Sequence, residues 1–180
     1  DGIILFDALN NADEARDVLV GGLKKIGLDP GQIKYLIIGH GHNDHTGGGL
    51  YVQNNYKPRI LMGGPDWNTV VAGQRPDRPV MKRDTDVTDG QTVTVGDTTV
   101  TLMLTPGHTP GTIAMLMPAK HQGRVHTALI LSSTQMPTRS SLATFEHVFN
   151  DFAKKQKAET ALSSHPDILV NMLPAMEALG

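Results

Sequence analysis

The sequence contains no cysteine. This absence excludes disulfide bonds, and it also excludes thiolate ligands for zinc, so histidine and aspartate would have to supply any metal site. The longest apolar runs are only a few residues, far short of a membrane span. A net charge of −2 gives no electrostatic reason to expect binding to nucleic acid or to an anionic membrane.

The remaining composition is that of an ordinary globular protein. The chain has 180 residues, of which 39% are hydrophobic and 19% are charged, so we expect one soluble domain that spans residues 1–180. No signal peptide is visible, and the chain opens on an apolar stretch that already predicts a strand. We therefore expect a periplasmic or secreted protein if a signal peptide precedes residue 1, and a cytoplasmic protein otherwise.

Apolar patterns predict alternating strands and helices in the first half of the chain. A helix is expected to begin at Asn10 or Asn11, whose side chains can cap its first turn. The region 63–90 is rich in glycine, proline and aspartate, which favours a short helix near Trp67 and then a long loop. Short apolar runs predict strands at 3–6, 35–38 and 59–62. A further helix is predicted at 50–56.

The second half is predicted to be mostly antiparallel. Alternating valine, leucine and threonine predict a hairpin that turns at Gly96-Asp97. The other predicted elements are strands 112–117 and 126–131 joined by a polar loop, a helix with its apolar stripe at 145–152, a strand at 160–164 and a helix at 168–179. This order suits a layered α/β domain in which helices cover the sheets.

Residues 40–45, His-Gly-His-Asn-Asp-His, place four potential metal ligands within six positions. Three imidazoles and a carboxylate this close together are costly to desolvate without a counter-ion. Side chains of successive residues in an extended turn point in different directions, so His40 and His42 can serve one ion while Asp44 and His45 serve another. The alternative is a polar, glycine-rich surface loop, but the spacing favours one wall of a two-metal site.

Two further histidines follow predicted strands. His108 lies in a stretch with two prolines and two glycines, Thr-Pro-Gly-His-Thr-Pro-Gly at 105–111, which predicts a rigid, sharply turned loop. His165 follows the strand predicted at 160–164. Taken alone, each could be an ordinary turn histidine. In open α/β sheets, however, ligands bind where strands end, so the two histidines complete a set of six candidate ligands.

The pattern H-x-H-x-D-H at 40–45, together with T-P-G-H-T-P-G at 105–111, resembles the metallo-β-lactamase superfamily. The resemblance extends over nearly the whole chain, to about His165. Within the superfamily, the sequence is most similar to the third subclass of metallo-β-lactamases, which has an all-histidine first zinc site, and to its uncharacterised relatives. The resemblance implies an α/β fold, a four-layer αββα sandwich. Family members carry N-terminal strands ahead of residues 1–7, so we expect a single domain that lacks those strands.

The resemblance also implies the roles of the candidate residues. His40, His42 and His108 would hold a first zinc, and Asp44, His45 and His165 a second. Many relatives bridge the two metals with an aspartate at a strand end, but the matching segment here is Ser-Ser-Thr at 132–134, so the bridging carboxylate is absent.

Residues near these ligands have expected roles too. Ser133 or Thr134 could hydrogen-bond a zinc-bound water, although a plain strand-end cap is the simpler role. Asp7 is expected to accept hydrogen bonds that hold a ligand loop in place.

The leading hypothesis is therefore a zinc-dependent hydrolase of small molecules. A metal-bound hydroxide would attack an amide or ester-type carbonyl, and Asp44 would orient it and carry its proton to the leaving group. Hydrolysis of a β-lactam is the first expectation, and a lactone or a thioester is the alternative. Two other classes remain open: an iron-dependent oxidoreductase of the persulfide dioxygenase type and a catalytically silent metal-binding domain.

Overall fold

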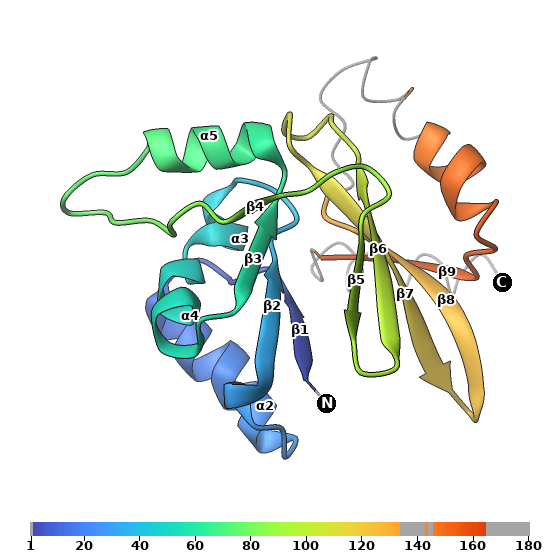
Figure 1. The fold of residues 1–180 in the computed structure, drawn as a ribbon, viewed down its shortest axis with the longest axis horizontal. Coiled ribbons are helices and arrows are strands. Elements are labelled where there is room, and N and C mark those ends of the chain that lie inside the picture. The colour runs from blue at the N-terminus through green and yellow to red at the C-terminus, as the bar shows by residue number, and fades with distance from the viewer. Residues whose placement is uncertain (1, 134–142, 144–145, 165–180) are drawn as a thin grey trace, which may run out of the picture.

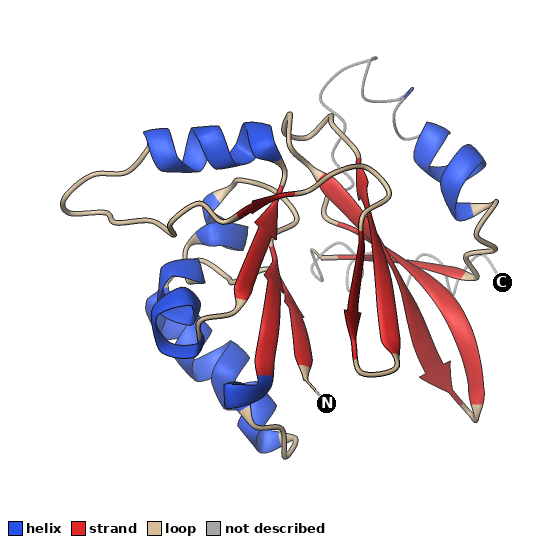
Figure 2. Cartoon of the chain, viewed as in Figure 1, coloured by secondary structure: helices blue, strands red, loops and turns tan. Residues whose placement is uncertain are grey.

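Two β-sheets lie face to face, and helices cover the outer side of each sheet (Figure 1). The computed structural model describes residues 2–133, 143 and 146–164 of the chain. Strands occupy the two central layers and helices the two outer layers (Figure 2). The helix predicted at 168–179 lies outside the described residues.

The first sheet contains four parallel strands in the order β1, β2, β3 and β4. Their bounds are Ile3–Phe6, Ile33–Ile37, Arg59–Met62 and Thr85–Asp86. The first three strands confirm the predictions from apolar runs. The fourth is a two-residue strand inside the region predicted as a long loop, and a strand this short has too few residues to show a periodic pattern.

Helical segments connect the strands of the first sheet. The first connection begins at Asn11, whose side chain accepts a hydrogen bond from the backbone N–H of Glu14 at 2.9 Å, and this confirms the predicted cap. The connection continues through a π-helical stretch, Ala15–Val20, before it ends in α2. The helices are α1 at Ala12–Glu14, α2 at Gly21–Lys25, α3 at Asn43–Thr46, α4 at Gly49–Tyr56 and α5 at Gly64–Ala72, with a 3₁₀ turn at Pro30–Gln32.

The second sheet has five strands in the order β5, β6, β7, β8 and β9. Neighbouring strands are antiparallel except β8 and β9, which are parallel. Their bounds are Thr92–Val95, Thr98–Leu104, Ile113–His121, Arg124–Leu131 and Thr160–Ser163. The predicted hairpin is confirmed, whereas the polar loop predicted between 117 and 126 is wrong. Strands β7 and β8 extend through most of it, and His121 pairs with Arg124 across the turn.

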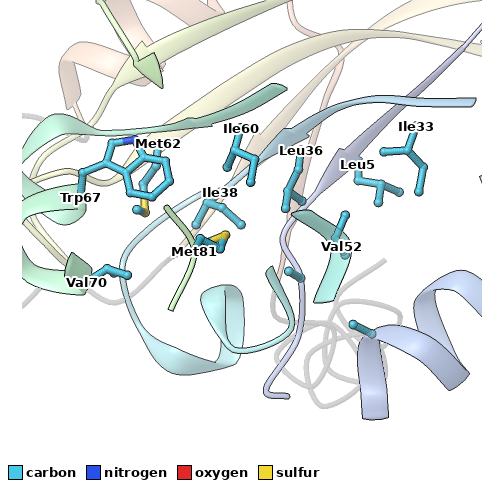
Figure 3. Packing of buried hydrophobic residues seen from close by; sticks show 12 residues of the cluster. Leu5, Ile33, Leu36, Ile38, Val52, Ile60, Met62, Trp67, Val70 and Met81 are labelled. Atoms are coloured by element: carbon cyan, nitrogen blue, oxygen red, sulfur yellow. The ribbon is translucent and has the colours of Figure 1, made fainter. Parts of the chain in front are cut away.

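Among the described residues, three apolar cores lie between the four layers. Alternate residues of one strand point into different cores, as the two-residue period of a strand requires. Ile60 and Met62 of β3 face the helices, and Leu61 between them faces the second sheet. The helix-side core receives Trp67 and Val70 from α5 (Figure 3).

The third core lies beyond the second sheet, where Leu129 of β8 packs in one cluster with Val148 of a second π-helical segment, His147–Ala153. The predicted αββα sandwich is confirmed. None of the helices in the described part of the chain is both long and apolar enough to span a membrane.

Candidate metal centre

The candidate ligands gather at one edge of the first sheet because its strands are parallel. Asp7 directly follows β1, and the residues from 38 to 45 follow β2. Helix α5 crosses the end of β3 at the same edge (Figure 1). The second sheet reaches this edge through the start of β7, where the N–H of Ile113 donates to the carbonyl oxygen of Gly39 at 2.9 Å. The loop before β7, which carries His108, is thereby tied to the loop after β2.

Three histidine rings converge at this edge. The Nδ1 atom of His42 lies 3.0 Å from Nε2 of His40 and 3.0 Å from Nε2 of His108. His40 is fully buried, His108 is half-buried and His42 is exposed. The group is therefore closed on the protein side and reachable from solvent at His42.

Hydrogen bonds among the three rings do not satisfy all of the converging nitrogens. A neutral imidazole nitrogen carries either one proton or one lone pair. The Nδ1 atom of His42 faces two ring nitrogens at once, so it can make only one well-directed hydrogen bond. A cation contacts all three lone pairs together, and three imidazoles with an open side are one of the ligand sets found in catalytic zinc sites. The donor chemistry of these residues therefore fits a zinc ion.

His40 is held by a serine from the second sheet. Its Nδ1 atom lies 2.8 Å from the hydroxyl oxygen of Ser132, which directly follows β8 and is itself buried. If Nε2 binds a metal, Nδ1 must carry the ring proton, and His40 then donates to that hydroxyl. From the sequence, Ser133 and Thr134 were the candidates for a hydrogen bond at the metal site. Thr134 lies outside the described residues, and the contact of Ser132 with His40 was not predicted.

His45 is fixed by Asp7, as the sequence predicted for an acceptor at this position. The Nδ1 atom of His45 lies 2.7 Å from one carboxylate oxygen of Asp7, and the other oxygen accepts a hydrogen bond from the N–H of Gly39 at 2.7 Å. Asp7 adopts a φ of 66°, a region that costs a non-glycine residue energy. With Nδ1 held by the carboxylate, His45 presents Nε2 to the site.

The charge around His45 favours a cation. Burial alone lowers the pKa of His45, but the hydrogen bond and the charge of Asp7, with Asp44 adding to them, raise that pKa above its usual value. The Nε2 atom of His45 lies 3.3 Å from a carboxylate oxygen of Asp44. The two carboxylates therefore stabilise positive charge at this point, whether the charge is a proton or a metal ion, and a metal has to displace the proton to bind.

Among the described residues, a second candidate ligand group consists of His40, Asp44 and His45. The rings of His40 and His45 lie 3.8 Å apart between centroids, so the two ligand groups adjoin. The predicted third ligand, His165, lies outside the described residues. The structure thus brings five of the six predicted residues together.

Asp44 and His45 open onto a cleft between the sheets. The cleft has a volume of about 420 Å³. It is lined by Phe6, Asp7, Leu9, Asp44, His45, Ile130, Leu162, Ser163 and Ser164. Ser164 is fixed at its rim, because its hydroxyl donates to the carbonyl oxygen of Ser132 at 2.8 Å. The end of β9 therefore reaches the same space as the second ligand group.

A buried aspartate that the sequence did not single out also lies at this edge. Asp66, in the first turn of α5, is only 2% exposed. Its carboxylate accepts hydrogen bonds from the N–H of Gly41 and from the hydroxyl of Thr109, each at 2.6 Å. An acidic residue early in a helix is ordinary, because it stabilises the helix N-terminus, so the sequence carried no distinctive signal for it.

Known proteins are similar to this chain over most of its length. The family model described as the metallo-beta-lactamase superfamily matches residues 1–121. Among solved structures, the subclass B3 metallo-beta-lactamase BJP-1 of Bradyrhizobium japonicum is 26% identical. The alignment covers 93% of this chain and 69% of BJP-1, with a TM-score of 0.74.

Two further structures share the fold. Metallo-beta-lactamase SMB-1, solved with bound 2-mercaptoethanesulfonate, is 23% identical over 93% of this chain and 71% of its own, with a TM-score of 0.75. The Rm3 metallo-beta-lactamase is 22% identical over 98% of this chain and 74% of its own, also with a TM-score of 0.75. The four layers and the family match lead to one conclusion: the chain belongs to the metallo-beta-lactamase superfamily and is a metallohydrolase of that fold.

Proposed function

We propose that the protein is a zinc-dependent hydrolase that cleaves the amide of a β-lactam ring. The observation that carries the proposal is the convergence of three histidine nitrogens, with both contacts to Nδ1 of His42 at 3.0 Å. The all-histidine group and the likeness to BJP-1, a subclass B3 metallo-beta-lactamase, support the β-lactam as substrate.

The first zinc would be held by His40, His42 and His108. When bound by three protein ligands, zinc lowers the pKa of a water molecule at its open position to about 7 and polarises a carbonyl group. Ser132 would orient His40 through the hydroxyl contact at 2.8 Å. The exposure of His42 leaves the approach to this group open for a small-molecule substrate.

The second zinc would be held by Asp44, His45 and His165. Asp7 supports this assignment, because its carboxylate lies 2.7 Å from Nδ1 of His45 and so directs Nε2 of that ring toward Asp44. The described residues Ser163 and Ser164 line the same cleft as Asp44 and His45, and this supports His165 as the third ligand.

Asp44 would move the proton that amide cleavage requires. Its side chain is 45% exposed, so it faces the open side of the cleft and not the core. A carboxylate oxygen of Asp44 can accept the proton of the attacking water and return it to the leaving nitrogen, a role that commonly contributes about 10²–10⁴-fold to the rate.

A substrate screen of the zinc-loaded protein tests the proposal. We expect turnover of the chromogenic β-lactam nitrocefin, loss of turnover after treatment with a chelator, and recovery on addition of zinc. An acyl-homoserine lactone and a thioester serve as comparison substrates.

Faster turnover of the lactone or the thioester than of nitrocefin would still support a zinc hydrolase. It would contradict the β-lactam as the substrate. Stoichiometric iron with little zinc in the purified protein would contradict the zinc hydrolase itself, and two bound zinc ions without turnover of any substrate would favour a silent metal-binding domain.

A further inference from the structure

The carboxylate of Asp66 joins two separate loops that each carry candidate metal ligands. One oxygen accepts from the N–H of Gly41 and from the hydroxyl of Thr109, each at 2.6 Å, and the other accepts from the N–H of Gly111 at 2.8 Å. Gly41 lies between His40 and His42, and Thr109 is the residue after His108. One side chain therefore connects the backbone on both sides of the three-histidine group.

The two loops leave just enough room for this carboxylate. A Cβ atom placed on Gly111 would lie 2.7 Å from Cγ of Asp66, closer than real Cβ contacts come. A Cβ atom on Gly41 would lie 3.1 Å from Cβ of Asp66. Glycine at both positions thus allows the backbone N–H groups to reach the carboxylate directly. A side chain at Gly111 would force Asp66 or the loop to move, and one at Gly41 would require a smaller adjustment.

Helix α5 gives the carboxylate a fixed base. Trp67, the next residue, is fully buried in the helix-side core (Figure 3). Its indole N–H donates to the carbonyl oxygen of Thr85 at 3.0 Å. The first turn of α5 is therefore held by the core of the first sheet. The loop that carries His108 leads into the second sheet. Hydrogen bonds to Asp66 connect this loop to the core of the first sheet.

We propose that Asp66 is a positioning residue that holds the His108 loop against the loop of His40 and His42 and so pre-organises the metal site. The inference rests on the proposed function, since it assumes that these histidines bind zinc. Asp66 itself is not proposed as a ligand, because its carboxylate accepts three hydrogen bonds from donors on the two loops. Partners of this kind typically contribute 10- to 100-fold to metal affinity, about the range expected here.

Replacing Asp66 with asparagine tests the effect of the hydrogen bonds while the size of the side chain stays the same. Asp66→Asn keeps the size of the side chain but replaces one acceptor oxygen by an NH₂ donor. Whichever way the amide turns, the NH₂ group faces at least one of the N–H groups of Gly41 and Gly111. Two donors then oppose each other in a buried place, and the two loops are expected to separate.

Zinc affinity of the metal-free protein, measured by competition with a chromogenic chelator, is the deciding measurement. For Asp66→Asn we expect zinc binding about 10- to 100-fold weaker than for the wild type. Thr109→Val removes a single donor to the carboxylate and is expected to weaken binding by a smaller factor.

Val93→Ala is the control, because it removes buried apolar atoms from the core between the sheets and β5 carries none of the candidate ligands. It is expected to lower the midpoint of urea unfolding at least as much as Asp66→Asn while leaving zinc affinity within about twofold. A general loss of stability would instead reduce zinc affinity in both variants alike.

Zinc affinity of folded Asp66→Asn within about threefold of the wild type would overturn the inference, because a positioning partner is expected to matter more. If Asp66→Asn does not fold, Thr109→Val decides, and unchanged affinity there would overturn it equally. Wild-type protein that binds no zinc would overturn the proposed function together with this inference. Wild-type binding with an unaffected Asp66→Asn variant would overturn this inference alone.

Discussion

Replacement of His108 by alanine is expected to reduce kcat/KM for the hydrolysed substrate by more than about 10³-fold, since loss of an outer partner alone typically costs 10- to 100-fold. His108 supplies one of the three ring nitrogens of the first candidate ligand group, and its Nε2 atom lies 3.0 Å from Nδ1 of His42. A site left with two protein ligands holds zinc weakly, so the zinc content of the purified protein should fall together with its activity.

Stability measurements separate this loss from misfolding. His108 is only half-buried, so the metal-free variant should unfold close to the wild type. Added zinc should raise the Tm of the wild type and not that of His108→Ala, because a ligand stabilises the fold only as far as it binds the native state. His121→Ala, at an exposed strand end, is the matched control and should keep both properties. Wild-type zinc content and turnover in His108→Ala would contradict the assignment.

Replacement of Asp44 by asparagine is expected to reduce kcat by about 10²–10⁴-fold, the usual contribution of a positioned acid–base group. The amide cannot accept the proton that a carboxylate oxygen accepts. The change also removes one ligand and one negative charge from the second group, so zinc content should fall from two ions per chain toward one. The first group does not include Asp44, and it should keep its zinc.

Metal analysis and kinetics of the same preparation distinguish these effects. Asp13→Asn is the control, since this carboxylate is 79% exposed and pairs with Arg16 away from the site. It should leave both the rate and the zinc content unchanged. Full activity of Asp44→Asn would contradict the role of Asp44 in proton transfer. Loss of both zinc ions from this variant would show that zinc binding at the two sites is not independent.

The elements of the buried sheets were predictable because each buried strand repeats an apolar pattern. Residues 59–62 were predicted as a strand and are β3, and alternate residues of that strand enter two different cores. The far ends of β7 and β8 were missed for the opposite reason. Lys120 and His121 of β7 are exposed and pair with Val125 and Arg124 of β8. An exposed hairpin end has no buried face, so no apolar alternation marks it.

The candidate metal ligands were predictable because four of them, all at positions 40–45, lie within six residues of one another in the sequence. Residues that hold the ligands in place were not predictable in the same way. Ser132 contacts His40 across 92 residues of sequence, and Asp66 reaches Gly111 across 45. Asp7 was the exception, since an acid at the end of a strand beside a ligand loop suggested its role. The other two are common residue types in common positions, and only the folded arrangement shows what they touch.

We expect His40, His42 and His108 to bind one zinc ion together. The most direct test is a crystal structure of the zinc-loaded protein with diffraction recorded at the zinc absorption edge. An anomalous peak is expected about 2.0–2.1 Å from Nε2 of His40, Nδ1 of His42 and Nε2 of His108. Stoichiometric zinc bound elsewhere, with no peak among these three nitrogens, would contradict it.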